Sequence, residues 1–591
     1  MRECDVVMKG GITSGVIYPG ALAEFAAHYR LHSLGGASAG AIGAALGAAA
    51  EYGRDTGGFT RLAAVPAQLG EGRLAALFQP QPGTRPLLPL LLAVTGHDRP
   101  GTGRSGAARV PAVAAALLRG FPVAGLLGLL PGAALAAFGW TAGGATGLVL
   151  VVVGLLLAVA GWLAGVTVAV LTRLTRAVPA NQFGICRGLG AGAGPGFTDW
   201  LSGQLDDLAG LPAEERPLRF GQLRSRDIDL RMISTCLSQG RPYELPWESG
   251  GFFFDPGVWA TLFPQPVMAA LLAAPPAAPS AGGAAAARDW AAEEAAAAAR
   301  SPALRRLPAA EHLPVVVATR LSLSFPLLVS AVPLWTIDRR AGAGPRFVQV
   351  WFTDGGLCSN FPLQLFDAAL PSRPTFAINL GDFAEGVAPS ADQAANIEFA
   401  RNNRGGLLPE FFEVPATGWA AIGGFASAAF NTARSWPDST QLNLPGYRDR
   451  IVRVLQTEAE GGLNLYMDAA TIAALTERGR AAAAALVAQF NEPRYPEREP
   501  RATGWENHRW VRYRALLSGL PAWLGSWAAG RDGLEEIGEA PPSYPLTGAT
   551  RRLAEELTGH LDAAAAALDD SAPTLAAAPA PVGVIRRVPR I

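Results

Sequence analysis

The pattern of apolar and polar positions over the first 52 residues predicts two short strands, each followed by a helix. Residues 4–8 (CDVVM) form an apolar run that ends at a lysine and two glycines, and residues 15–29 follow with the spacing of a helix. Residues 30–34 form a second strand-like run, and residues 39–52 are small and apolar. This β-α-β-α opening favours an α/β fold with a mainly parallel central sheet.

Later parts of the chain continue the α/β pattern with interruptions. Residues 274–303 are rich in alanine and proline, which predicts a linker and an Ala-rich helix without chemistry of its own. From about residue 385 onward the pattern indicates mostly helices and loops. The further predicted strands are residues 228–237, 314–318, 347–353 and 374–379.

Two uncharged apolar stretches, residues 121–140 and 148–171, are each long enough to cross a hydrocarbon core of ~30 Å. The short loop TAGGATG joins them and carries no charge. Arginines flank only the outer ends, which predicts a two-span membrane hairpin with both ends in the cytoplasm. A buried helical hairpin in a large core is the alternative. The flanking arginines are Arg109, Arg119, Arg173 and Arg176.

Composition narrows the class of protein. Half of the residues are hydrophobic and 17% are charged, which suggests contact with a membrane. Lys plus Arg equals Asp plus Glu at 49 each, so the charge gives no indication of a nucleic-acid partner. The N-terminus contains no apolar stretch long enough for a signal peptide. The four cysteines lack C-x-x-C spacing, so neither a zinc site nor a disulfide framework is predicted, and a reducing compartment is favoured. They are Cys4, Cys186, Cys236 and Cys358.

Residues Gly36 to Gly40 (GASAG) fit the pattern G-x-S-x-G, which makes Ser38 a candidate nucleophile. In a chain with 69 glycines the pattern also arises by chance, so the motif alone is weak. Its context is more specific, because a strand precedes it and a small-residue helix follows. Such a turn exposes a serine hydroxyl at a helix N-terminus, where developing negative charge is favoured.

A serine nucleophile needs a base. The strand-end sequence WFTDGG places Asp354 before Gly355 and Gly356, where a carboxylate could accept the serine proton directly. A plain Asp-Gly turn is the alternative interpretation. An ordinary α/β-hydrolase would instead use a late histidine, but it would also place several strands before the nucleophile. The late histidines, none in a strand-end sequence, are His312, His508 and His560.

Residues 9–15 (KGGITSG) follow the first predicted strand, next to the strand that carries Ser38 in a parallel sheet. Consecutive glycines expose backbone N–H groups, so Gly10 and Gly11 are candidates for an oxyanion hole, together with Ala39 just after the serine. A phosphate-binding loop is the competing use, but neither G-x-G-x-x-G nor the Walker pattern is satisfied.

With these motifs the sequence resembles the patatin-like phospholipases, which combine a glycine-rich oxyanion loop, a G-x-S-x-G turn and a distant D-G-G or D-G-A aspartate. KGGITSG, GASAG and TDGG occur here in that order, and residues 318–335 look like the family's segment ahead of the aspartate. The likeness covers roughly residues 4–60 and 216–383. It departs at the first loop, where Lys9 replaces an acid and Ile12 the third glycine.

The resemblance implies a three-layer α/β/α fold and a catalytic dyad of Ser38 and Asp354. It implies an oxyanion hole from Gly10, Gly11 and Ala39, and no cofactor or metal. The expected activity is hydrolysis of carboxylic esters in phospholipids or related lipids. A lipid acyltransferase with the same dyad, or a non-catalytic membrane scaffold with a degenerate loop, remain alternatives.

The predicted organisation is a core interrupted by an insert. Residues 1–60 would supply the first part of the core and residues 216–383 the second part. Residues 61–215 would form the insert with the apolar hairpin, and residues 384–591 a mostly helical region of unknown role. We therefore predict a membrane-associated protein whose catalytic part is cytoplasmic and whose partners are the bilayer and a lipid substrate.

Overall fold

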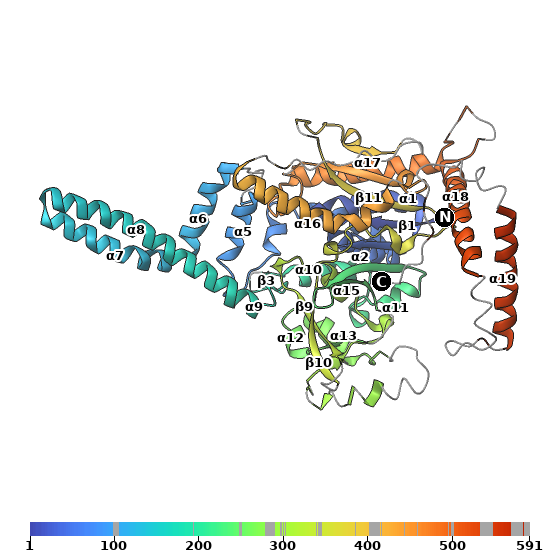
Figure 1. The fold of residues 1–591 in the computed structure, drawn as a ribbon, viewed down its shortest axis with the longest axis horizontal. Helices are drawn as coiled ribbons and strands as arrows, with labels where there is room; N and C mark the ends of the chain where they lie inside the picture. The colour runs from blue at the N-terminus through green and yellow to red at the C-terminus, as the bar shows by residue number, and fades with distance from the viewer. Residues whose placement is uncertain are drawn as a thin grey trace. The chain divides into compact units, whose positions relative to one another are not determined.

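The computed structural model, drawn as a ribbon in Figure 1, comprises two compact units. Unit 1 comprises Met1–Leu365, Ile378–Ile397 and Arg453–Ala484, and unit 2 comprises Phe366–Ala377, Glu398–Val452 and Ala485–Ile591. The structure describes residues 1–98, 106–192, 194–247, 251–277, 290–292, 294–295, 298–299, 301, 303–338, 340, 345–384, 386–400, 414, 417–442, 444–457, 459–494, 496–497, 501–531, 546, 548–568, 583 and 585. Much of the predicted Ala/Pro-rich insert at residues 274–303 lies outside the described residues.

The predicted β-α-β-α opening is confirmed, with β2 running three residues further than expected. Strand β1 pairs with β2 in parallel, and β2 pairs with β4 in parallel. Helix α2 is buried almost all round, because its alanines and glycines let it lie close against the sheet and the neighbouring helices. These elements are β1 (Arg2–Met8), η1 (Ser14–Ile17), α1 (Tyr18–His28), β2 (Tyr29–Ala37), α2 (Ala39–Tyr52) and β4 (Asp229–Cys236).

The central sheet is mixed, so the prediction of a mainly parallel sheet is only partly correct. Its strands follow the order β12-β13-β11-β1-β2-β4-β10-β9-β6-β7, with β5 paired to β4, and the edge strand β12 spans Ile397–Phe399. The β1-β2-β4 part is parallel, whereas β10, β9, β6 and β7 pair antiparallel. Their bounds are β5 (Arg241–Leu245), β6 (Phe253–Phe254), β7 (Arg305–Arg306), β9 (Val332–Asp338), β10 (Arg346–Thr353), β11 (Thr375–Asp382) and β13 (Ile451–Gln456).

The strand predicted at residues 314–318 is wrong. The structure forms helix α15 (Val315–Ser322) there, and all eight of its residues are buried. A short apolar run reads the same in a buried strand and in a fully buried helix, so periodicity could not separate the two. The smaller elements of unit 1 are β3 (Gly184–Cys186) paired with β8 (Leu327–Val329), α3 (Gly58–Gln68), α4 (Arg73–Ala76), α10 (Phe197–Ala209), α11 (Phe220–Arg224), α12 (Pro256–Trp259) and α13 (Gln265–Ala273).

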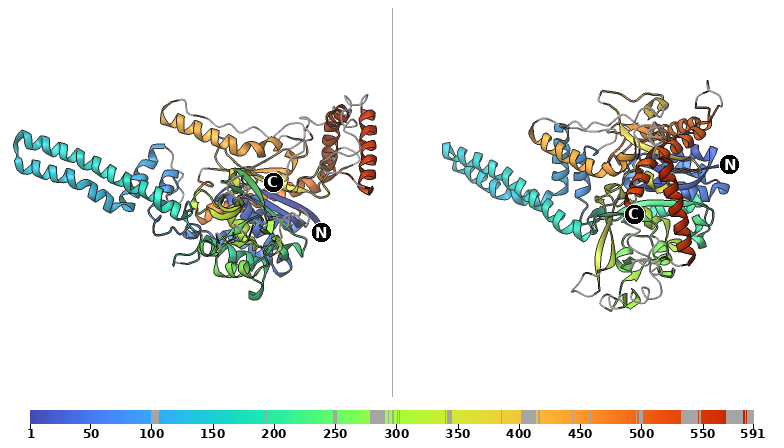
Figure 2. Two further views of the ribbon diagram at one scale, coloured as in Figure 1. Left: turned by 60° about the horizontal axis from the view of Figure 1, so that its bottom comes forward. Right: turned by 45° about the vertical axis from the view of Figure 1, so that its right-hand side comes forward.

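The apolar stretches form two long antiparallel helices, α7 (Pro122–Ala142) and α8 (Gly144–Thr172). The predicted loop of residues 141–147 is shorter than expected, because Gly143 alone separates the helices. Gly143 and Gly144 both have φ of +66°, a left-handed conformation that glycine adopts without strain. Figures 1 and 2 show the hairpin projecting from the rest of unit 1, with α5 (Leu87–Thr95) and α6 (Val110–Gly120) at its base.

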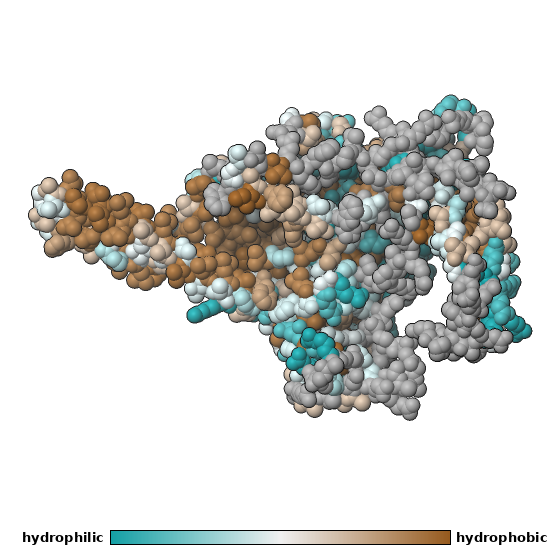
Figure 3. Space-filling model, in the orientation of Figure 1, coloured by the Kyte–Doolittle hydropathy of each residue, from teal (hydrophilic) through white to brown (hydrophobic). Residues whose placement is uncertain are grey.

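Small residues line the contact between α7 and α8. A Cβ added at Gly128 would lie 2.1 Å from the backbone of Gly161, and one added at Gly154 would lie 2.4 Å from the backbone of Ala136. Large apolar side chains point outward instead, with Leu156 66% exposed, and brown atoms cover the hairpin in Figure 3. A helix pair in water buries its large apolar side chains, so the hairpin has the reverse pattern, which is typical of helices packed in lipid.

Unit 2 is mostly helical, as predicted for the C-terminal region. Its helices are α16 (Gly418–Leu442), α18 (Gly504–Arg531) and α19 (Gly548–Leu568), and α17 (Ala469–Asn491) divides between the two units. Buried charges in unit 2 are paired: Arg450 and Arg512 both donate to the carboxylate of Asp367, 2.9 and 3.1 Å away. Such pairing is required where charged groups leave water.

Candidate active site

Ser38 occupies a strained turn between β2 and α2. Its φ of +55° and ψ of −127° are rare for a residue with a side chain, and strain of this kind is concentrated at functional sites. The turn requires its flanking glycines: a Cβ at Gly36 would lie 2.5 Å from the backbone of Gly40, and one at Gly40 would lie 2.2 Å from the carbonyl oxygen of Met8. The G-x-S-x-G sequence therefore has the strand-turn-helix context that a nucleophile needs.

The strands before Ser38 and Asp354 end on either side of β4. The last residue of β2, Ala37, pairs with Ile233 in parallel, and the last residue of β10, Thr353, pairs with Thr235 in antiparallel register. Although β10 runs against β4, the two strands overlap only at their carboxyl ends. An antiparallel strand therefore delivers its following residue to the same edge of the sheet as β2.

Extending each register by one residue would place Ser38 and Asp354 on opposite sides of the same residue of β4, Ser234. In that register two strand spacings, roughly 10 Å, would separate their backbones. Ser38 and Asp354 are both buried, and the hydroxyl of Ser234 bonds the carbonyls of Thr353 and Leu321, which links the end of β10 and helix α15 to β4. The fold thus brings together two residues that lie far apart in sequence.

Asp354 is held in a defined orientation. Its Oδ1 accepts the N–H of Gly356 at 2.8 Å, and its own N–H donates to the carbonyl of Ser324 at 3.1 Å. Gly355 packs against β4, where an added Cβ would lie 1.9 Å from the carbonyl oxygen of Ile233. The two glycines after the aspartate therefore allow close packing and supply an N–H to the carboxylate.

One of the three N–H groups predicted to form the oxyanion hole is already bonded within the protein. The N–H of Gly10 donates to the backbone carbonyl of Asn360 at 2.8 Å, so it is not available to an oxyanion, which corrects the prediction for that residue. Gly10 instead provides space, since an added Cβ would lie 2.9 Å from Cβ of Ser38. In the described part of the chain, the N–H groups of Gly11 and Ala39 donate to no protein acceptor, which leaves two of the three predicted donors.

Two residues that sequence reasoning missed connect the three motifs. Asn360 donates its amide to the carbonyl of Gly10 at 3.2 Å, and its Oδ1 lies 2.4 Å from where Gly356 would carry a Cβ. Ser322 accepts the N–H of Ser38 at 3.1 Å and donates to Ile233 at 2.6 Å. Each lies close in sequence to a motif, but no spacing rule identified its partner.

Arg320 supports the segment that holds Asp354. It is fully buried and donates to the hydroxyl of Ser324 and to the carbonyls of Arg187 and Ser330. Burial lowers the pKa of Arg320, and Cys186 acts in the opposite direction. A buried guanidinium bound to neutral acceptors is costly to displace, so it fixes the position of Ser324 and hence of the aspartate.

Residues 456–478, which the sequence placed in a region of unknown role, hold the other side of the glycine loop. The carbonyl of Gly462 accepts both the N–H and the hydroxyl of Thr13, and Gln456 accepts the hydroxyl of Ser14 at 2.8 Å. The segment is tied down by Arg478, 1% exposed, which pairs with Glu460 at 2.9 Å. Burial opposes ionisation of Glu460, but hydrogen bonds from Arg478 and from the N–H of residue 457 hold its pKa below the ordinary value.

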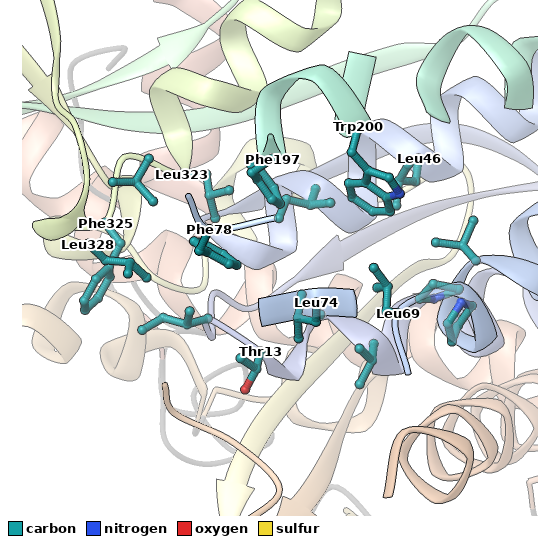
Figure 4. A pocket seen from close by; sticks show the side chains of 18 residues that line it. Thr13, Leu46, Leu69, Leu74, Phe78, Phe197, Trp200, Leu323, Phe325 and Leu328 are labelled. Atoms are coloured by element: carbon teal, nitrogen blue, oxygen red, sulfur yellow. The ribbon is translucent and has the colours of Figure 1, made fainter. Parts of the chain in front are cut away.

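An apolar cavity of about 60 Å³ begins beside the glycine loop. It includes Ile42 and Leu46, one and two helical turns beyond Ser38 on α2. Figure 4 shows Phe325 near one end and Trp200 beside Leu46 near the other, with a stacked pair of phenylalanines between them. The wall of the cavity is almost wholly apolar, so it suits a hydrocarbon chain better than a polar group.

The histidines weighed as bases lie in other contexts. His508 is buried on α18, where its Nδ1 lies 2.8 Å from the carboxylate of Asp449. His560 is exposed on α19, and His312 ends a short 3-10 helix. Among the described residues, no group of three or more His, Cys, Asp or Glu side chains could hold a metal ion.

A comparison with known proteins identifies a relative along most of this chain. No family model matches the chain. The "RpoH suppressor" of Rhizobium meliloti (strain 1021) is 33% identical over 619 aligned positions, which cover 92% of this chain and 90% of that protein. The chain belongs to the RpoH suppressor family. Among solved structures, VipD from Legionella pneumophila matches with 13% identity over 98% of this chain and 90% of that chain. The TM-score for that match is 0.28.

Proposed function

We propose that this member of the RpoH suppressor family is a membrane-anchored serine hydrolase that cleaves carboxylic esters of lipids. The observation that carries the proposal is the strained turn at Ser38, together with the strands before Ser38 and Asp354, which end on either side of β4. The resemblance of the three motifs to the patatin-like phospholipases supports the same activity.

In the proposed first step, Asp354 accepts the proton of Ser38 as Oγ attacks the ester carbonyl. The C–O bond to the alcohol breaks, and the alcohol leaves with the proton that Asp354 returns. In the second step, Asp354 takes a proton from water, the hydroxide attacks the acyl-serine, and the fatty acid leaves as Ser38 regains its proton. The Gly356 N–H orients the carboxylate throughout.

The N–H groups of Gly11 and Ala39 are the proposed oxyanion donors. Each such donor typically contributes a factor of ~10²–10³ in rate. Asn360 and Thr13 hold the glycine loop on its two sides, which keeps Gly11 fixed although Ile12 replaces a glycine of the related loops. Pre-positioned donors of this kind cost no reorganisation when the negative charge develops.

The apolar hairpin supports a lipid substrate. Its outward side chains are large and apolar and its contact is formed by small residues, the arrangement favoured in a bilayer. The mean hydropathies of the two candidate spans are 1.7 and 2.6. In the proposed topology both helices cross the membrane and the rest of unit 1 remains on the cytoplasmic side. Anchoring would raise the effective concentration of substrate at the site.

The cavity beyond Ser38 predicts a preference for short acyl chains. Trp200 lies beside Leu46, two helical turns or about 11 Å along α2 from the serine. An extended chain advances ~1.3 Å per carbon, so roughly eight carbons reach the indole. Trp200→Ala is expected to move the optimum of kcat/KM towards longer p-nitrophenyl esters, while the exposed Trp510→Ala leaves the profile unchanged. An unchanged profile in Trp200→Ala would show that the acyl chain binds elsewhere.

The activity itself is tested with the detergent-purified chain and phospholipid vesicles, with and without a lysophospholipid acceptor. Release of free fatty acid in both conditions is the expected result. Release that appears only as acyl transfer to the acceptor would make the protein a transferase. If no product forms and a fluorophosphonate does not label the protein, both enzymatic functions are contradicted. The non-catalytic membrane scaffold is then the remaining function.

A further inference from the structure

A second cavity lies at the base of the apolar hairpin. Its volume is about 680 Å³, within the range of small-molecule sites. The walls come mostly from α5 and α6 and are largely apolar, with Pro86, Leu92 and Ala112 among them. Tyr466 adds a phenol and Asp98 a carboxylate, so the cavity has two cationic residues and one acidic residue. The cavity thus combines an apolar wall with a few polar groups, as ligand sites do.

The cavity is built where the membrane helices begin and end. Gly120, the last residue of α6, packs on Pro86, since an added Cβ would lie 3.3 Å from Cβ of that proline. Helix α7 starts two residues later, at Pro122. At the end of α8, Arg173 donates to the carbonyl of Gly83 at 2.8 Å. Both ends of the hairpin therefore meet the segment that lines the cavity.

Two arginines, Arg85 and Arg119, are among the residues that line this cavity. Both side chains belong to exposed residues, and neither forms an ion pair or hydrogen bond with another described residue. Their cations are therefore available to a ligand. Arg119 immediately precedes the hairpin, which places its cation at the level where lipid headgroups lie if the hairpin crosses a membrane.

The surrounding sequence is strongly cationic although the whole chain has no net charge. Residues 72–180 contain eight arginines, no lysine, one aspartate and no glutamate, so eight minus one gives a formal charge of +7. The complete chain has 49 positive and 49 negative residues. Positive charge that is concentrated beside a membrane hairpin is attracted to anionic lipids.

We propose that the cavity binds one anionic glycerophospholipid, with its phosphate between Arg85 and Arg119 and an acyl chain along the apolar wall. The proposal rests on the membrane insertion in the proposed function but not on its chemistry. A free phosphate would use the two cations and leave the apolar wall exposed to water. A zwitterionic lipid would place the positive group of its own headgroup beside the two arginines. An anionic lipid pairs its phosphate with the two arginines and covers the apolar wall with an acyl chain.

The test is titration of the full chain, purified in a non-ionic detergent, with phosphatidylglycerol or phosphatidylcholine of identical acyl chains. Bound lipid is counted by native mass spectrometry. The double variant Arg85→Gln and Arg119→Gln removes the cations of the cavity. The matched control, Arg73→Gln and Arg176→Gln, removes the same charge from exposed arginines of the same cationic segment that do not line the cavity.

One phosphatidylglycerol per chain is expected, bound at least 10-fold more weakly by the cavity variant and unchanged in the control. Equal loss in both variants would overturn the proposal in favour of diffuse surface attraction. Equal binding of phosphatidylcholine would show that the cavity selects only for apolar chains and would contradict the proposal. Displacement of the lipid by inorganic phosphate would show that the cavity is a site for free anions. Carbonate extraction and ester hydrolysis are measured on the same variants. Loss of binding with hydrolysis intact therefore separates this proposal from the catalytic one.

Discussion

Replacement of Ser38 by alanine is expected to lower ester hydrolysis by at least ~10³-fold, to the background of the assay. The hydroxyl is the proposed nucleophile, and the loss of one member of a catalytic unit costs nearly as much as the loss of all. Asp354→Asn is expected to cost a comparable factor, because an amide does not take up the serine proton. The measurement is kcat/KM for a short-chain p-nitrophenyl ester and release of fatty acid from vesicles.

Both variants are designed to keep the fold. Alanine fills the space of Ser38 apart from one oxygen, and asparagine at residue 354 retains an acceptor for the N–H of Gly356. Ser225→Ala and Asp207→Asn alter an exposed serine and an exposed aspartate outside the site, and they are expected to retain full activity. Full activity in Ser38→Ala or Asp354→Asn would contradict the dyad.

Arginines placed on the outward face of the hairpin are expected to release the protein from membranes. Leu130 and Leu156 lie near the middle of α7 and α8 and are 59% and 66% exposed. In water, replacement of an exposed leucine by arginine has little effect on stability. In a bilayer each arginine costs about 2.5–3.5 kcal/mol on insertion scales, so the double variant loses roughly 5–7 kcal/mol.

The measurement is the fraction of protein that remains in the membrane pellet after a carbonate wash. Wild type is expected in the pellet and the Leu130→Arg, Leu156→Arg variant in the supernatant or degraded. Leu237→Arg, at a leucine that is 55% exposed in a turn after β4, serves as the control and is expected to remain in the pellet. Wild type in the supernatant would show that the hairpin does not anchor the chain.

The parts of the fold that the sequence predicted are those set by local pattern. Strand β1, helix α2 and the two hairpin helices follow from apolar runs of the right length and from small residues at the turns. The error at residues 314–318 arose because α15 is buried on all sides, so its run of valines has no polar face to reveal helical spacing. The one-residue hairpin turn depends on the left-handed conformation of Gly143, which a glycine-rich loop permits but does not specify.

Non-local features of the site could not be predicted. The direction of β10 relative to β4 depends on the course of the chain between them, so the sequence did not indicate that an antiparallel strand carries Asp354. The partner of the Gly10 N–H, Asn360, lies 350 positions away. Arg478 supports the glycine loop through Glu460, from a region to which no motif assigned a role. Each of these contacts depends on tertiary packing rather than on spacing.

The convergence of Ser38 and Asp354 without a histidine is the central claim, and a crystal structure of the fluorophosphonate adduct tests it most directly. The phosphorus is predicted on Oγ of Ser38, with a phosphoryl oxygen within ~3.1 Å of the N–H groups of Gly11 and Ala39. The carboxylate of Asp354 is predicted within ~3.5 Å of the same Oγ. An adduct on another residue, a carboxylate that points away, or a histidine between the two side chains would contradict the account.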